Sequence, residues 1–394
     1  MSVKSLAWIP ESIRFGTDPV CSADIEQLTS DAVTSTNIYC EQRYASADGS
    51  RIAIERKPFG RPVEIWVCNM PSLRICKIAE GRTVGANSSL DAVYYVSQDA
   101  GVSRLMRLDL KELVSRELFE FDGPAPSCGS VSPDERVFVC GPYPVEGKKN
   151  VYSLCRIDLA DKKMVTLCEV QDMFNPHLQF DPGNGSRAFV QINRGGVSDF
   201  SKDMKSFTGP LGATLALVDV ETGKISPLPV GRPHTPSISG HEAWAGKSGR
   251  IFFTAGQYDV SSSSYVKLKN PPDQEKNMPA AAIYSVTPGD SEPGVLAKGL
   301  VFNHISVSDD GRFFTGDNHD DGVIHVGNSE TGRYLPLCHS HTRQGSCQHS
   351  HVHSYMTPDN KYVIFNSIVT GIAQVYAACI PDGFLDKVIN LKGY

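Results

Sequence analysis

Histidine is the residue type that first suggests chemistry in this sequence, because three of its 11 histidines lie together at His349, His351 and His353. His351 and His353 are two residues apart, a spacing that places both side chains on one face of a β-strand. Gln348 precedes them and could add an amide oxygen. Nitrogen and oxygen ligands together suit a borderline divalent metal such as manganese, zinc, iron or nickel. His349 precedes the expected strand, and we interpret it as a loop residue.

Two cysteines near these histidines leave a second interpretation open. Cys338 and Cys347 lie close by in the sequence, and a closed structural zinc site commonly uses thiolate ligands. The same region therefore permits either an open metal site with room for a ligand or a closed structural zinc site.

The elements that must position these residues are indicated by a repeat. A polar turn followed by an alternating β-rich run occurs six times, and a weaker copy makes a seventh; the turns read SADGSR, SPDER, DPGNGSR, AGKSGR, SDDGR, TPDNK and, more weakly, NSSLD. Most units continue with two further short β runs around a polar turn, and four short strands per repeat are typical of a propeller blade. We therefore predict an all-β fold, a seven-bladed β-propeller that forms a single domain over residues 1–394. A pair of β-sandwiches is the weaker alternative.

Four histidines occupy similar places in consecutive repeats. His304 and His353 each lie six residues before the aspartate of the turn that follows, and His177 and His241 fall in nearly the same register. Equal distance from the turn predicts similar depth along the innermost strand, which lines the central channel. A lone histidine in a strand is usually structural, but four aligned histidines favour a functional site.

The charge and hydrophobicity of the chain exclude some classes of binding partner. The net charge of −6 provides no basic surface for nucleic acid or anionic membrane, and no segment approaches the roughly 20 apolar residues of a membrane span. The start of the chain lacks the apolar run of a signal peptide. Eleven cysteines without CxxC pairs do not form a recognisable disulfide framework. We expect a cytoplasmic protein that binds neither nucleic acid nor membrane.

Three motifs together resemble a known family. Gln348-x-x-His351-x-His353 followed by a Pro-Asp turn, the segment NHISVSDDGRFFTGD with its histidine and later Gly-Asp, and GHEAW are similar to motifs of the oligogalacturonate lyases. The resemblance implies a seven-bladed propeller that binds manganese and cleaves short galacturonate oligomers by β-elimination in the cytoplasm. It also implies that the metal ligands are His304, Gln348, His351 and His353, and that His241 is the general base.

The resemblance is specific from about residue 236 onward, and the sequence departs from the family pattern at one arginine position. The segment NPHLQFDP is similar to a further family motif that places His177 and Gln179 beside the substrate. The family also has an arginine, proposed to stabilise the reacting carboxylate, in the strand aligned with residues 213–217, and this chain has none there. Arg194 and Arg232 are candidates to supply the missing charge.

These inferences lead to one main hypothesis and two alternatives. We expect a metal-dependent lyase, with manganese as the expected ion, that acts on a small acidic oligosaccharide, most simply digalacturonate, to give a 4-deoxy-5-keto uronate. The missing arginine leaves open a different uronide or oxidised glycoside. A non-catalytic propeller with a structural metal is the other alternative, although a structural site would not need a histidine such as His241 besides its ligands. Trp244 is interpreted mainly as a core aromatic residue.

Overall fold

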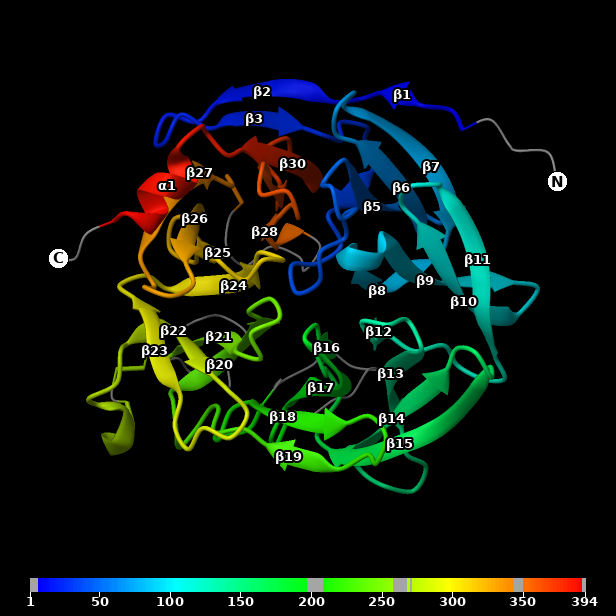
Figure 1. Ribbon diagram of the computed structural model, residues 1–394, viewed down its shortest axis with the longest axis vertical. Helices are drawn as coiled ribbons and strands as arrows, with labels where there is room; N and C mark the ends of the chain where they lie inside the picture. Colours follow the sequence, from blue (N-terminus) through cyan, green and yellow to red (C-terminus); the bar gives the residue numbers. More distant parts are fainter. Residues whose placement is uncertain (1–5, 197–207, 258–267, 270, 343–349, 392–394) are drawn as a thin grey trace.

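Seven antiparallel sheets stand around a central axis like the blades of a propeller (Figure 1). The computed structural model describes residues 6–196, 208–257, 268–269, 271–342 and 350–391. The predicted seven-bladed β-propeller is therefore confirmed. The helical elements include the short helix α1 (Phe384–Ile389) and the 3-10 turns η1 (Ser88–Leu90) and η2 (Asp273–Glu275). No helix in the described part of the chain is long and apolar enough to cross a membrane.

The first four blades follow one another along the chain, and the strands of each run in the following order from the innermost outward. The first contains β4 (Thr34–Thr36), β5 (Arg51–Lys57), β6 (Glu64–Asn69), β7 (Arg74–Glu80) and β1 (Ile9–Pro10). The second contains β8 (Arg82–Asn87), β9 (Ala92–Asp99), β10 (Val102–Asp109) and β11 (Val114–Phe121). The third contains β12 (Cys128–Val131), β13 (Val137–Pro144), β14 (Val151–Asp158) and β15 (Lys163–Gln171). The fourth contains β16 (Gln179–Asp181), β17 (Asn184–Ile192), β18 (Thr214–Asp219) and β19 (Ile225–Pro227).

The last three blades carry most of the candidate site. The fifth contains β20 (Ser237–Trp244), β21 (Ile251–Gly256), β22 (Ala281–Val286) and β23 (Gly294–Lys298). The sixth contains β24 (Phe302–Val307), β25 (Phe313–Asn318), β26 (Val323–Asn328) and β27 (Tyr334–His339). The seventh contains β28 (Tyr355–Met356), β29 (Tyr362–Ser367), β30 (Gln374–Cys379), β3 (Asp24–Gln27) and β2 (Ile13–Thr17).

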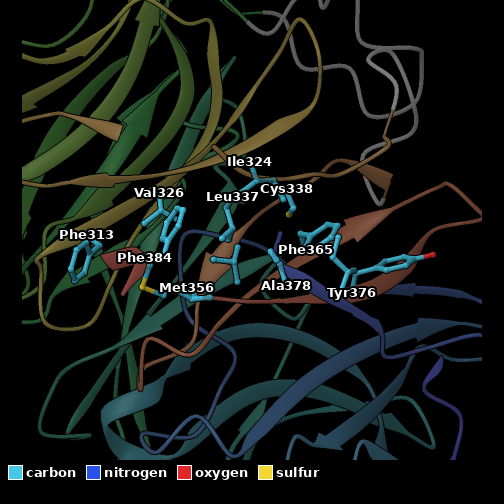
Figure 2. Packing of buried hydrophobic residues seen from close by; sticks show 14 of the residues in the cluster. Phe313, Ile324, Val326, Leu337, Cys338, Met356, Phe365, Tyr376, Ala378 and Phe384 are labelled. Carbon is cyan, nitrogen blue, oxygen red and sulfur yellow. The ribbon is translucent and has the colours of Figure 1, made fainter. Parts of the chain in front are cut away.

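The two ends of the chain close the ring in the seventh blade. β3 from the N-terminal region pairs antiparallel with β30, so that Ile25 lies opposite Ala378. A buried apolar cluster then joins this blade to the sixth, with Phe313 and Leu337 on one side and Phe365 on the other (Figure 2). Long-range strand pairing and apolar packing therefore hold the two ends of the propeller together.

The repeated turns of the sequence have a common hydrogen-bond pattern. In the first blade, the Ser46 hydroxyl donates to Asp48 at 2.6 Å and accepts the backbone N–H of Arg51 at 3.0 Å. A serine or threonine hydroxyl donates in the same way to the aspartate two residues later at three further turns, those of Ser132, Ser308 and Thr357. This short-range pairing fixes the turn that follows the innermost strand, and it explains why the turn motif recurs.

The cysteines are consistent with the absence of a disulfide framework. The ten cysteines in the described part of the chain are all free thiols. Cys338, one of the two cysteines in the zinc alternative, packs in the apolar cluster of Figure 2. Cys347 lies outside the described residues.

Candidate metal and active site

Five aromatic rings from five neighbouring blades form a closed circuit in the centre of the propeller. Neighbouring ring centroids are separated by 5.9 Å (Tyr39 to His177), 6.3 Å (His177 to His241), 4.3 Å (His241 to His304), 4.5 Å (His304 to His353) and 4.3 Å (His353 to Tyr39). The four histidines that the repeat register aligned are therefore brought together. Tyr39 completes the circuit, and no sequence pattern had singled it out.

Three of the histidines can supply nitrogen atoms to one ion. One ring nitrogen from each of His304, His351 and His353 lies within 4.8 Å of the others, and we call these residues the three-histidine group. His304 and His353 are buried, whereas His351 is partly exposed. Gln348, the fourth predicted ligand, lies outside the described residues.

Two of the site histidines lie where the pairing register of their strand shifts. The pairing register of β20 with β21 shifts between Ile238 and Glu242, around His241. The register of β24 with β25 shifts between Phe302 and Ile305, around His304. An extra residue in a strand bends it and changes the direction of a side chain, so both histidines sit where the backbone departs from regular pleating.

The backbone conformation before His241 requires a glycine. Gly240 has a φ of +82°, and a Cβ atom at this position would lie 2.8 Å from Oε1 of Gln191. Glycine tolerates this left-handed conformation at no steric cost. The Gly-His pair of the GHEAW motif is therefore needed to bring the imidazole to its place.

The prediction that His351 and His353 share one face of a strand is wrong. Both residues precede the short strand β28, and His353 has a φ of +43°, in the left-handed region. Their backbone carbonyls accept hydrogen bonds from side-chain amides instead of from a strand partner: Asn366 donates to His351 at 3.0 Å, and Asn37 donates to His353 at 2.7 Å. These two asparagines hold a loop conformation that still directs both imidazoles to the group.

A buried carboxylate fixes the orientation of His304. Nδ1 of His304 lies 2.9 and 3.1 Å from the two carboxylate oxygens of Asp317, and both side chains are almost fully buried. Since a carboxylate only accepts, Nδ1 carries the hydrogen and Nε2 keeps its lone pair. Nε2 has no hydrogen-bond partner among the described residues. A carboxylate behind an imidazole is the usual support of a histidine metal ligand, so the residues present fit a bound divalent ion.

His241 lies against this group as a neutral imidazole. Burial and the neighbouring histidines, His304 foremost, lower its pKa well below the ordinary value, and a hydrogen bond with the backbone of Asn303 offsets this only in part. Nδ1 of His241 has no hydrogen-bond partner within the described ranges. A neutral ring with a nitrogen in this state can accept a proton.

A second ionisable group lies on another side of His241, and we call it the Glu-His-Glu group. His177 forms a short ion pair with Glu41 through Nδ1, and the same nitrogen lies 3.7 Å from Glu242. Burial alone would lower the pKa of His177, but Glu41 and Glu242 raise it to about 9. Burial raises the pKa of Glu242 to about 8, although His177 opposes the shift. Neither glutamate was predicted from the sequence as a site residue.

Signals for these glutamates were present in the sequence. Glu242 directly follows His241 in the GHEAW motif. Glu41 lies seven residues before Asp48 of its turn, only one position from the register that aligned the histidines. A search of that register for carboxylates as well as imidazoles would have found Glu41.

Like His177, the three other predicted substrate-binding residues have hydrogen-bond or ion-pair partners within the protein. Gln179 donates to the backbone carbonyl of Glu242 at 2.8 Å. Arg194 donates to several backbone carbonyls, including that of Gly212 at 2.9 Å. Arg232 forms a buried ion pair with Glu275. The roles of these three residues toward a substrate stay predictions.

The core interpretation of Trp244 agrees with its surroundings. Its side chain is buried in the apolar cluster that links β20 to its neighbours. The indole N–H donates to the backbone carbonyl of Gln179 at 3.2 Å.

Comparison with known proteins agrees with the fold and with the motifs. No family model matches the chain. An oligogalacturonate lyase of Dickeya dadantii (strain 3937) is 23% identical over 401 aligned positions, which cover 93% of this chain and 95% of the relative. An oligogalacturonide lyase of Pectobacterium atrosepticum is 22% identical and covers 95% of this chain and 97% of its own length. The chain is therefore similar in sequence to oligogalacturonate lyases over nearly its whole length.

Solved structures of such lyases share its architecture. An oligogalacturonate lyase in complex with manganese superposes with a TM-score of 0.69 at 19% identity, covering 96% of this chain and 98% of its own. An oligogalacturonate lyase from Vibrio parahaemolyticus gives a TM-score of 0.70 at 16% identity, with 96% and 99% coverage. At this level of identity the structural likeness establishes the fold.

Proposed function

We propose that the protein is a metal-dependent lyase that cleaves short uronic-acid oligosaccharides by β-elimination, with oligogalacturonate as the favoured substrate. The observation that carries this proposal is the contact of His241 with His304, whose ring centroids are 4.3 Å apart. This contact supports the proposal, because a neutral imidazole next to a cation-binding group could accept the proton of a metal-bound substrate. The curated relatives named as lyases of oligogalacturonate support the same substrate class.

The reaction requires removal of the proton at C5 of a 4-linked uronate, next to its carboxylate. A divalent ion in the three-histidine group would offset the negative charge of that carboxylate and so make the C5 proton more acidic. His241 takes the proton. The C4–O bond to the next sugar breaks as the C4–C5 double bond forms, and the proton gained by the leaving oxygen balances the one removed from C5. Digalacturonate would give an unsaturated uronate that becomes a 4-deoxy-5-keto product.

The residues that would hold the ion are His304, His351 and His353, with Gln348 a further candidate. Asp317 holds the ring of His304 from behind. Three imidazoles and an oxygen suit manganese among several borderline divalent metals, and the manganese complex of a structural relative supports that choice. The free thiols are compatible with a cytoplasmic location, which we infer as well.

The test is an ultraviolet assay for the new double bond, using metal-loaded protein and a panel of di- and trisaccharides of galacturonate, glucuronate and other uronates. Turnover of digalacturonate that stops after chelation and returns with Mn²⁺ supports the proposal. Turnover of another uronide alone would keep the chemistry and correct the substrate. A panel without any turnover would contradict the proposed function and favour a non-catalytic propeller.

A further inference from the structure

A fully buried glutamate in the Glu-His-Glu group lacks hydrogen-bond partners. Glu242 has no exposed side-chain surface, and neither carboxylate oxygen has a hydrogen-bond partner among the described residues. The ring nitrogen that faces it, Nδ1 of His177, is 3.7 Å away. An ionised carboxylate in this position is costly unless it is paired.

Protonation would only partly relieve this cost. A protonated carboxyl group gains an O–H donor that itself needs an acceptor, and its two oxygens have no hydrogen-bond partner within the described part of the chain. A cation, in contrast, would pair with the carboxylate directly. The unpartnered oxygens of Glu242 therefore point to a missing positive ligand.

The neighbours of Glu242 complete a set of ligand atoms. One carboxylate oxygen of Glu41, one of Glu242 and a ring nitrogen of His177 all lie within 4.8 Å of one another. The three side chains are at most 9% exposed. We propose that the Glu-His-Glu group binds a second divalent cation, separate from any ion of the three-histidine group.

The donor set defines the class of cation. Two carboxylate oxygens and one imidazole nitrogen suit a borderline ion such as Mn²⁺ or Zn²⁺, whereas Mg²⁺ and Ca²⁺ favour oxygen ligands alone and Cu⁺ favours sulfur. Asn175 lies 2.8 Å from Nε2 of His177, and Nδ1 faces both glutamates. A cation on Nδ1 requires the ring hydrogen on Nε2, and the amide oxygen of Asn175, turned toward Nε2, would accept that hydrogen bond.

The backbone also supports a preformed site. Glu41 lies between β4 and β5 of the first blade, His177 just before β16 of the fourth, and Glu242 in β20 of the fifth. His177 has a φ of +44°, a left-handed conformation that is unfavourable for a residue with a side chain. Such strain persists where surrounding structure enforces it, often at functional sites.

If the proposed function is right, a second cation would also help to bind the substrate. The His241 ring is a neighbour of His304 at 4.3 Å and of His177 at 6.3 Å, so the base would have a cation-binding group on each of two sides. A uronate dimer carries one carboxylate on each sugar. Two cations would then offer a separate positive charge to each carboxylate.

The test is the stoichiometry of Mn²⁺ on the full-length protein, measured by elemental analysis after dialysis and by titration with electron paramagnetic resonance of free Mn²⁺. The parent protein should bind two equivalents. Glu242→Gln, which keeps the shape but removes the charge, should bind one. His351→Ala/His353→Ala should also bind one, and adding Glu242→Gln to that variant should abolish binding.

The matched control is Glu292→Gln, because Glu292 also faces a histidine, His234, but is 68% exposed. This variant should bind two equivalents. One equivalent on the parent, or binding by Glu242→Gln equal to that of Glu292→Gln, overturns the second site. Both results leave the proposed function standing, because its own metal is tested by the histidine variants. The comparison of the two glutamate variants does not depend on whether the double histidine variant folds.

Discussion

Asp317 accepts a hydrogen bond from Nδ1–H of His304, and its two carboxylate oxygens lie 2.9 and 3.1 Å from that nitrogen. The same carboxylate also accepts the backbone N–H of His304 at 3.2 Å. Two contacts to one residue fix both the ring and its backbone. The nitrogen left over, Nε2, is therefore held in one orientation toward the rest of the three-histidine group.

Asp317→Asn should weaken Mn²⁺ binding at the three-histidine group about 10–100-fold, the usual effect of losing such a support. The asparagine amide can donate to Nδ1, which would move the ring hydrogen to Nε2 and block the ligand. The measurement is Mn²⁺ titration in a Glu242→Gln background. Asp310→Asn, a change in a surface turn, is the control, and equal affinities for the two variants would rule out the supporting role.

His351→Ala/His353→Ala should lose one equivalent of Mn²⁺ while keeping an all-β circular dichroism spectrum. Two of three imidazoles are removed, and a single histidine does not hold a borderline ion firmly. Elemental analysis after dialysis measures the loss. Metal content equal to that of the parent would show that the ion binds elsewhere.

Arg232→Met should destabilise the protein by about 3–5 kcal/mol, because it leaves Glu275 as an unpaired charge in the interior. Glu275 is fully buried and Arg232 nearly so. Urea unfolding measures the change, with Arg14→Met, at a side chain that is 69% exposed, as the control. Unchanged stability together with a raised KM for a uronide would instead assign Arg232 to the substrate.

We expect the protein to lose stability in acid when the turn aspartate Asp48 becomes protonated. Hydrogen bonds from Ser46 and Ser50 lower its pKa from 3.8 to about 2. Because the folded-state pKa is the lower one, the stabilisation is complete above about pH 4 and is lost as the pH falls through about 2. Asp48→Asn should flatten the dependence of unfolding midpoint on pH in this window. A change at the exposed Asp382 should not, and identical profiles for both variants would contradict the role of the turn.

Local patterns in the sequence were sufficient to predict the fold. At four of the turns a serine or threonine donates a hydrogen bond to the aspartate two residues later, so these turns are encoded by neighbouring residues. The positions of His241 and His304 on the innermost strands were predicted from their distance to the turns, but the register shifts around both residues were not. The pairing of β3 with β30, which closes the ring, joins residues 349 to 353 positions apart and had no local signal.

The candidate site was only partly predictable for the same reason. Alternation assumes regular strands, whereas His351 and His353 lie in a loop held by distant asparagines, and Asn37 is 316 residues from His353. Glu41 approaches His177 from 136 residues away. Contacts of this range arise only when the blades are assembled, and a single sequence does not reveal them.

Replacement of His241 tests the central claim most directly, because it separates the base from the metal ligands. His241→Ala should keep bound Mn²⁺ and substrate affinity but lower the rate of uronide cleavage by about 10²–10⁴, the usual contribution of a positioned proton acceptor. His234→Ala, at a partly exposed histidine paired with Glu292, is the control and should match the parent. A His241→Ala protein that cleaves its uronide as fast as the parent would contradict the proposed mechanism.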